Sequence, residues 1–353
     1  MSSSANSKKL DRLILNSMAN GFPQSLQIQV TRKNKLLFKK KYGHQYKFFD
    51  LASLTKIFVT TPLIMKLIDE NLIALGDKLE SHLPFFKGTS LGAIQVIRLL
   101  NHSSGVIWWR PFYKILNKLP FELRKPSLQK MLRGERLSKI GQCVYSDLDM
   151  MILGWVIEDK FQMNLNEAYD LNFVRPLGLK DTFFVFNEQI SKAQNIKQFA
   201  PTGREGKTVI RGIVHDQNAR ALGGVSGNSG LFSTPDETSK IAQIYFQTLK
   251  GKKNPVFSQK TMKKFSKRSV TKRAGDWALG FSIPSRPVSS GGKKISKEAF
   301  GHTGFTGTSV WIDPVRETVV TVLSNRTYPS AKDERFLQLR RDIHDAVWEM
   351  IDG

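Results

Sequence analysis

The sequence has little cysteine and no apolar run long enough to span a membrane. A single cysteine, Cys143, cannot form an intramolecular disulfide, which excludes a disulfide framework. A membrane-spanning helix needs about 20 consecutive apolar residues, and the sequence contains no such run. Residues 1–20 also lack the continuous apolar core of a secretory signal, so we expect a cytoplasmic protein. A different N-terminus would instead allow a periplasmic or secreted protein.

Acidic residues are scarce relative to basic ones. The 353 residues include 54 Lys and Arg against 30 Asp and Glu, which gives a formal net charge of +24. The basic excess is concentrated in residues 32–41 and 250–273 and would attract anionic surfaces such as cell-wall polymers or lipid headgroups. These runs contain no recognisable nucleic-acid module and no interleaved aromatic residues, so we expect no nucleic-acid partner. Of the two interpretations, attraction to an anionic surface or an ordinary solvent-exposed basic surface, we favour the second.

The pattern of apolar residues predicts both strands and helices. Apolar and polar residues alternate over 25–42, which predicts a β-hairpin with its turn near 32–35. Further strands are predicted at 307–313 and 318–324. Helical patterns occupy 53–71, 148–158, 238–249 and 337–350. Pro62 should kink or restart the first of these helices.

Strands near both termini, with helices between them, predict an α+β fold. We expect a mostly antiparallel sheet built from both termini and flanked by helices, with an inserted, mainly helical subdomain. Residues 1–24 are expected to form an N-terminal extension and residues 25–353 a single domain. Within that domain, the α/β part would comprise about 25–76 and 208–353, and the helical insertion about 77–207.

Several common catalytic motifs are missing. The sequence has neither a His-Glu-x-x-His zinc motif nor a Gly-x-Ser-x-Gly nucleophile elbow, and Cys143 lacks a cysteine-protease signature. The remaining candidate is Ser-x-x-Lys, which occurs four times, starting at Ser53, Ser127, Ser269 and Ser290. Only Ser53 stands at the start of a strongly apolar helix.

The position of Ser53 is suited to a nucleophile. Residues three apart share one face of a helix, so Lys56 can reach the Ser53 hydroxyl. A helix N-terminus also offers free backbone N–H groups and a positive dipole end, which favour a developing anion. A plain helix N-cap is the alternative interpretation, and for Ser53 taken alone it is the better one.

Two further motifs favour the catalytic interpretation. Tyr145-Ser146-Asp147 precedes a predicted helix, and His302-Thr303-Gly304 precedes the C-terminal strands. The three motifs follow the chain order of active sites built from Ser-x-x-Lys, then Ser-x-Asn or Tyr-x-Asn, then Lys-Thr-Gly. Each short motif occurs easily by chance, whereas three in this order do not.

With these motifs, the chain resembles the β-lactamase-related serine hydrolases, which include class C β-lactamases, DD-peptidases and family VIII-type esterases. The resemblance extends over nearly the whole chain after the first two dozen residues. Besides the three motifs, it rests on the stretches at residues 99–105, 175–179, 214–219, 222–234 and 301–307.

The resemblance implies a role for each motif residue. Ser53 would attack a carbonyl carbon and form an acyl-enzyme, Lys56 would steer the proton, and Tyr145 would act as general base. The backbone N–H groups of Ser53 and Phe305 would form the oxyanion hole. Residues 25–353 would then be the catalytic domain, and no metal or organic cofactor is implied. The remaining substrate-binding positions would be Asp147, His302, Thr303 and Gly304.

Two positions depart from the β-lactamase pattern. Asp147 replaces an Asn, and a carboxylate can only accept hydrogen bonds from a substrate. Asp147 would also hold Lys56 protonated, which favours Tyr145 as the base. His302 replaces the Lys of many β-lactamases, and a neutral imidazole binds a substrate carboxylate less strongly. Both changes favour ester or small-amide hydrolysis over efficient penicillin hydrolysis.

The chemistry also yields two expectations about ionisation. A tyrosine with a pKa near 10 is almost fully protonated at neutral pH, and lowering that pKa by about three units needs roughly 4 kcal/mol of stabilisation. A charged Lys56 nearby could supply it, whereas the negative charge of Asp147 would oppose it, so the net effect stays open. Because an ordinary histidine titrates near pH 6.5, we expect His302 to make the activity sensitive to pH near neutrality.

The leading hypothesis is therefore a serine hydrolase that acts by acyl transfer on esters or small amides. The expected partner is a small-molecule ester, amide or peptide substrate. The alternatives are a cell-wall DD-peptidase or penicillin-binding enzyme, a β-lactamase, and a catalytically silent binding protein on the same scaffold. A cell-wall enzyme would suit the basic surface, but no secretion signal is visible. The intact Ser53, Lys56 and Tyr145 argue against a silent scaffold.

Overall fold

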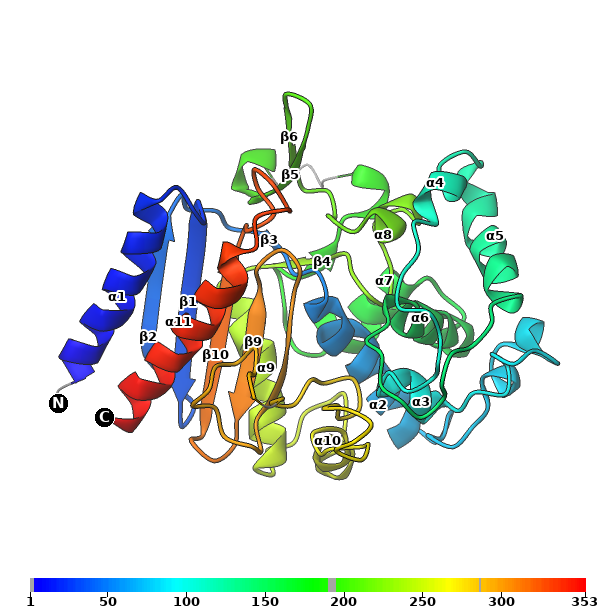
Figure 1. Ribbon diagram of the computed structural model, residues 1–353. Helices are drawn as coiled ribbons and strands as arrows, with labels where there is room; N and C mark the ends of the chain where they lie inside the picture. Colours follow the sequence, from blue (N-terminus) through cyan, green and yellow to red (C-terminus); the bar gives the residue numbers. More distant parts are fainter. Residues whose placement is uncertain (1–2, 190–194, 286) are drawn as a thin grey trace.

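A five-stranded antiparallel sheet joins the two ends of the chain (Figure 1). The computed structural model describes residues 3–189, 195–285 and 287–353. The strand order β2-β1-β10-β9-β8 places N-terminal strands beside C-terminal ones, which confirms the predicted fold class. The strands are β1 (Ser25–Arg32), β2 (Lys35–Gly43), β8 (Phe300–Thr303), β9 (Ser309–Asp313) and β10 (Thr318–Ser324).

The β1–β2 hairpin follows from its sequence pattern. Leu26, Ile28 and Val30 alternate with polar residues and belong to one apolar cluster on a single face of the sheet. Lys33 and Asn34 both have positive φ, at 50° and 63°, which is the geometry of a tight two-residue hairpin turn. The predicted hairpin and the position of its turn are confirmed.

Helices cover both faces of this sheet. The first and last helices, α1 (Ser3–Ala19) and α11 (Arg335–Asp352), lie side by side on one face, while α9 (Pro235–Leu249) packs on the other (Figure 1). Leu10 and Ile14 of α1 are fully buried in the same cluster as Leu26 and Val347. We expected residues 1–24 to form an N-terminal extension. Most of this segment is instead a helix that packs on the sheet. Residues 1–2 lie outside the described residues.

The rest of the chain forms a mainly helical region beside the sheet. Its centre is α6 (Asp147–Phe161), in which every residue from Leu148 to Ile157 is buried, as expected for a helix enclosed on all sides. Two small sheets accompany it, β3-β7-β4 and β5-β6. Their strands are β3 (Phe49–Asp50), β4 (Phe183–Phe184), β5 (Pro201–Glu205), β6 (Thr208–Arg211) and β7 (Leu231–Ser233). The other helices are α2 (Thr61–Asp69), α3 (Val96–Leu100), α4 (Tyr113–Leu116), α5 (Phe121–Arg133), α7 (Leu165–Tyr169), α8 (Gln217–Ala221) and α10 (Gln259–Phe265).

The segment predicted as one helix over 53–71 divides into two parts. A π-helical turn, η1 (Lys56–Thr60), follows Ser53 and leads directly into α2. Pro62 lies in the first turn of α2, where its missing N–H costs no hydrogen bond, so the predicted restart is confirmed. π-Helical turns occur frequently at functional sites.

The docking of α1 generates a stability prediction. Ile14→Ala should lower the free energy of unfolding by about 2–5 kcal/mol, because a fully buried side chain would leave a cavity. The neighbouring Leu15 is 54% exposed, so Leu15→Ala should change it by less than about 0.5 kcal/mol. Urea unfolding of both variants measures the difference. Equal, small effects would mean that α1 does not pack on the sheet.

Candidate active site

Ser53 lies in a sharp turn immediately after β3. Ala52 before it has a φ of 48°, a conformation that costs energy for a residue with a side chain and is often found at functional sites. Asp50 holds the turn: its Oδ1 accepts a hydrogen bond from the Ala52 N–H at 2.8 Å and its Oδ2 one from the His215 N–H at 2.8 Å. The strained turn is thus fixed by buried hydrogen bonds rather than by a helix cap.

Lys56 is fully buried, and its ammonium group reaches three acceptors. Its Nζ lies 2.8 Å from Ser53 Oγ, 2.7 Å from Asp147 Oδ1 and 3.0 Å from the Asn228 carbonyl oxygen. An ammonium has three hydrogens, so these contacts satisfy it completely. Burial alone would lower the pKa of Lys56, but Asp147 and Tyr145 outweigh burial and raise it. Lys56 is therefore positively charged at neutral pH.

Tyr145 reaches the same serine from the other motif. Ser146 caps the N-terminus of α6 by accepting a hydrogen bond from the Asp149 N–H, which fixes the segment that carries Tyr145 and Asp147. The Tyr145 hydroxyl lies 2.7 Å from Ser53 Oγ and 3.4 Å from Asp147 Oδ1. The structure thus brings Ser53, Lys56, Tyr145 and Asp147 into one hydrogen-bonded group, although about 90 residues separate the two motifs.

The Tyr145 ring is enclosed by other aromatic residues. Trp277 stacks on it with ring centroids 5.7 Å apart, and the His102 ring meets it edge-on at 5.0 Å. Burial and the Asp147 charge outweigh the Lys56 ammonium and raise the pKa of Tyr145 to about 12. The Lys56 charge does lower the pKa of Tyr145, as expected, but burial by segments distant in sequence, with the Asp147 charge, has the larger effect.

The third motif lies against the Ser53 turn. Thr306 and Thr308 donate side-chain hydrogen bonds to the Asp50 and Leu51 carbonyl oxygens at 2.7 and 3.0 Å. A Cβ at Gly304 would lie 2.6 Å from the Leu51 carbonyl oxygen, so only glycine fits there. Thr303 and Gly304 line the same pocket as Ser53.

The backbone N–H groups of Ser53 and Phe305 have no acceptor among the described residues. Free N–H groups beside a nucleophile are what an oxyanion hole requires. The Phe305 side chain is half exposed at the pocket, and its carbonyl oxygen accepts a hydrogen bond from Arg326 Nε at 2.6 Å. Arg326 therefore helps to fix the main chain at Phe305.

His302 lines the pocket but is buried and neutral. Burial, with the Lys56 charge adding to it, lowers the pKa of His302 to about 3. The prediction that His302 titrates near neutrality is therefore wrong. Its Nδ1 lies 2.7 Å from the Thr303 carbonyl oxygen, which can only accept, so Nδ1 carries the proton. The buried Nε2 has no partner among the described residues and offers a lone pair.

A pocket of about 670 Å³ joins these residues. Trp108, Trp109, Arg326 and Arg340 also line it. Sequence reasoning missed several residues of this site, among them the two arginines, Trp277 and Asn228. Only Asn228 had a signal, because it lies in a glycine-rich stretch of the family resemblance. Among the described residues, no cluster of His, Cys, Asp or Glu is arranged to hold a metal ion. None of the described helices has the length and apolar character to cross a bilayer.

Comparison with known proteins assigns this site to a family. A family model described as Beta-lactamase matches residues 10–344, so the chain belongs to the beta-lactamase family and is a serine hydrolase of that family. A protein of Salmonella gallinarum (strain 287/91) named "Putative D-alanyl-D-alanine carboxypeptidase" is 30% identical over 363 residues, covering 91% of this chain and 82% of the relative.

Solved structures share the fold at low sequence identity. EstCE1, "a hydrolase with promiscuous acyltransferase activity", superposes with a TM-score of 0.78 at 18% identity, covering 98% of this chain and 99% of its own. A class C beta lactamase from Rhodobacter sphaeroides gives 0.72 at 17% identity, covering 97% and 98%. The octameric penicillin-binding protein homologue from Pyrococcus abyssi gives 0.72 at 18%, covering 92% and 74%. At these identities the likeness supports the fold alone.

The charge state of His302 predicts the shape of the pH profile. His302→Gln should leave the shape of kcat/KM between pH 5.5 and 8 unchanged, because a histidine with a pKa of about 3 does not titrate in that range. An acid limb can still arise from Asp216, whose pKa burial raises, and it should persist in the variant. Loss of an ionisation near pH 6.5 in the variant would contradict the assignment.

Proposed function

We propose that this protein hydrolyses esters or small amides through an acyl-enzyme on Ser53. The observation that carries the proposal is the position of Ser53 Oγ, 2.8 Å from Lys56 Nζ and 2.7 Å from the Tyr145 hydroxyl, at the wall of an open pocket. A nucleophile, a proton acceptor and unused N–H donors are the parts that acyl transfer requires.

In the acylation step, Ser53 Oγ forms a bond to the substrate carbonyl carbon. Its proton moves to the Tyr145 oxygen, while the proton of Tyr145 moves towards Asp147 Oδ1. This relay removes the need for a preformed tyrosinate, which a pKa of about 12 makes rare at neutral pH. The carbonyl oxygen, now negatively charged, accepts hydrogen bonds from the Ser53 and Phe305 N–H groups.

The second half of the reaction reverses these proton movements. When the tetrahedral intermediate collapses, the bond to the leaving group breaks and the relay returns the proton to the leaving oxygen or nitrogen. Water then attacks the acyl-enzyme carbonyl and gives a proton to Tyr145, and Ser53 recovers its proton as the acid departs. Lys56 stays an ammonium throughout and stabilises the negative charge that develops on Ser53 Oγ.

The polar groups of the pocket favour an ester or small amide as substrate. Asp147 is already engaged with Lys56 and cannot donate to a substrate carbonyl. His302 is neutral where many β-lactamases present an ammonium, because burial lowers its pKa to about 3. A substrate without a carboxylate at this point fits better than a penicillin.

Two arginines support a peptidase as the second candidate. Arg326 and Arg340 are buried at the pocket wall, and no carboxylate among the described residues pairs with either. Both guanidinium groups donate to main-chain carbonyl oxygens, and a substrate carboxylate would supply the charged partner that neither has among the described residues. The name of the Salmonella gallinarum relative points to the same substrate class. A β-lactamase and a silent binding protein are the other candidates.

Covalent labelling separates these candidates. A fluorophosphonate should label the wild type at Ser53, and Ser53→Ala should lose the label, since no other hydroxyl of the described residues contacts both Lys56 and Tyr145. Mass mapping locates the adduct, and a labelled penicillin is tested in parallel. Labelling by the fluorophosphonate alone supports an esterase, labelling by both a penicillin-binding enzyme, and labelling by neither the silent scaffold.

The relay predicts how two conservative variants behave. Tyr145→Phe should lower kcat by about 100- to 10,000-fold, because it removes the group that receives the Ser53 proton. Asp147→Asn should also lower kcat, because an amide cannot take the proton from Tyr145 and leaves Lys56 without its counter-charge. Steady-state kinetics on one activated ester measures both. Full activity of Asp147→Asn would exclude the relay and leave Tyr145 acting alone.

A further inference from the structure

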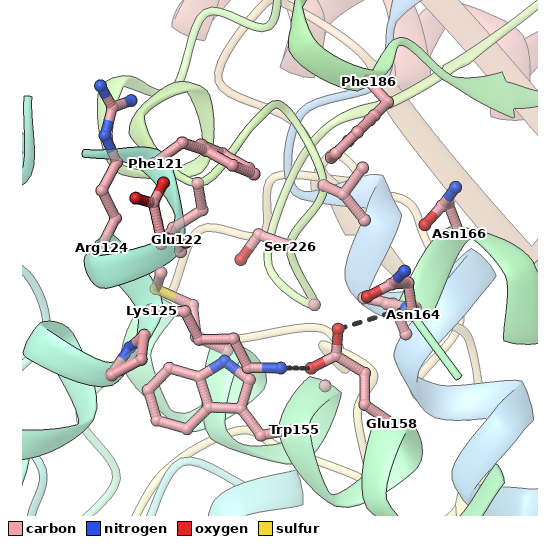
Figure 2. A pocket seen from close by; sticks show the side chains of 17 residues that line it. Phe121, Glu122, Arg124, Lys125, Trp155, Glu158, Asn164, Asn166, Phe186 and Ser226 are labelled. Carbon is pink, nitrogen blue, oxygen red and sulfur yellow. Dashed lines mark hydrogen bonds and ion pairs between the residues drawn. The ribbon is translucent and has the colours of Figure 1, made fainter. Parts of the chain in front are cut away.

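A second cavity, distinct from the catalytic pocket, lies between α5, α6 and the segment 222–227. Its volume is about 320 Å³, within the range of about 300–1,000 Å³ typical of small-molecule sites. Figure 2 shows Phe121 and Phe186 at one end and Trp155 at the other, with the Ser226 side chain projecting into the space between them. We propose that this cavity is a regulatory site for an uncharged aromatic molecule that carries a carbonyl group.

The walls of the cavity select an aromatic ligand. Phe121 and Phe186 are 40% and 43% exposed, and their rings touch edge-to-face with centroids 5.9 Å apart. Two large exposed aromatic residues at the mouth of a pocket would be better covered by a flat ring than by water. Trp155, with Met151 and Leu165 beside it, provides apolar contacts deeper in the cavity.

The charges around the cavity cancel, which selects an uncharged ligand. Lys125 Nζ is paired with Glu158 Oε2 at 2.5 Å, as the dashed line in Figure 2 marks. Arg124 donates instead to the carbonyl oxygens of Leu119 and Ala221. With Glu122, the lining holds two basic and two acidic side chains. The lining as a whole therefore carries no net charge, so it has no excess charge to offset the lost hydration of a charged ligand.

The polar groups that face the cavity are suited to a carbonyl. The Ser226 hydroxyl donates to Asn228 Oδ1 at 2.7 Å and can turn to donate to a ligand acceptor instead. Asn164 and Asn166 also line this end of the cavity and carry amide N–H groups (Figure 2). A ring with a carbonyl oxygen can therefore accept from these donors, with Ser226 exchanging its hydrogen bond to Asn228 for one to the ligand.

A ligand in this cavity would affect the hydrogen bonds of Lys56. The carbonyl oxygen of Asn228 is one of the three acceptors of the Lys56 ammonium, at 3.0 Å, and the carbonyl oxygen of Gly227 accepts from Thr60 at 2.6 Å. The main chain at Gly227 packs tightly against α6, since a Cβ on Gly227 would lie 2.1 Å from the Met150 carbonyl oxygen. A ligand that draws the Ser226 hydroxyl away from Asn228 frees this segment and weakens its hold on Lys56.

The effect of the ligand on catalysis rests on the proposed function, whereas binding of the ligand to the cavity does not. The expected result is a fall in kcat with little change in KM, because Lys56 acts on the reacting serine and the ligand does not enter the substrate pocket. Coupling between two sites commonly amounts to about fivefold or more, and we expect a decrease of that size at saturating ligand.

Binding is tested by calorimetry on the full chain with 2-acetylnaphthalene, an uncharged ketone that cannot be hydrolysed. The ketone should bind wild type and Ser53→Ala equally, and the anionic 2-naphthoate should bind at least about tenfold more weakly. Phe121→Ala and Phe186→Ala should each weaken ketone binding by about tenfold. Leu123→Ala is the matched control, since Leu123 is an exposed residue of α5 that does not line the cavity, and it should bind normally.

The catalytic effect is tested with the same ketone in an ester-hydrolysis assay. A fall in kcat that is lost in Phe121→Ala but kept in Leu123→Ala supports the proposal. Absence of binding, binding that ignores Phe121→Ala and Phe186→Ala, or binding that leaves kcat unchanged would overturn it. If no ester is hydrolysed at all, the proposed function fails instead, and calorimetry still decides whether the site exists.

Discussion

The buried ammonium group of Lys56 is the interaction on which the site depends. An unpaired charge in a protein interior costs several kcal/mol, so this residue requires its acceptors to be in place before the fold is stable. The three acceptors come from three separate segments: the Ser53 turn, the start of α6 at Asp147, and the main chain at Asn228. The same bonds that satisfy Lys56 therefore align Ser53 with the segment just before α6 that carries its proposed base, Tyr145.

The nucleophile is held by backbone geometry as much as by charge. Ala52 adopts a left-handed conformation, and Gly304 allows the third motif to approach the Leu51 carbonyl closely. Both features cost conformational freedom, and the Asp50 carboxylate offsets this by accepting two backbone N–H groups. The result is a serine whose hydroxyl faces the pocket while its N–H group stays free for a substrate oxygen.

Sequence patterns predicted the parts of this arrangement that depend on local order. Alternation predicted the β1–β2 hairpin, and helical periodicity predicted α6 and most of α9 and α11. The three motifs predicted which side chains meet, because family resemblance carries spatial information that periodicity lacks. The role of α1 was missed, although Leu10 and Ile14 are spaced to lie on one helix face.

The properties that the sequence did not predict arise from burial by distant segments. Tyr145 and His302 are ordinary residues in their own motifs, and burial against distant segments, such as the one that carries Trp277, keeps both neutral. The Asp147 charge adds to this effect at Tyr145, and the Lys56 charge adds to it at His302. Arg340 gave no signal either, because its lack of an acidic partner is a fact of three-dimensional structure. Charge states at this site are consequences of the fold, and they change the proposed mechanism from a preformed base to a relay.

Pre-steady-state kinetics with a 4-nitrophenyl ester tests the central claim most directly, because it observes the acyl-enzyme itself. If Ser53 forms a covalent intermediate that breaks down more slowly than it forms, nitrophenol should appear in a rapid burst whose amplitude approaches one per active site, followed by a slower steady rate. A burst of the same amplitude in the Ser53→Ala variant would contradict the account.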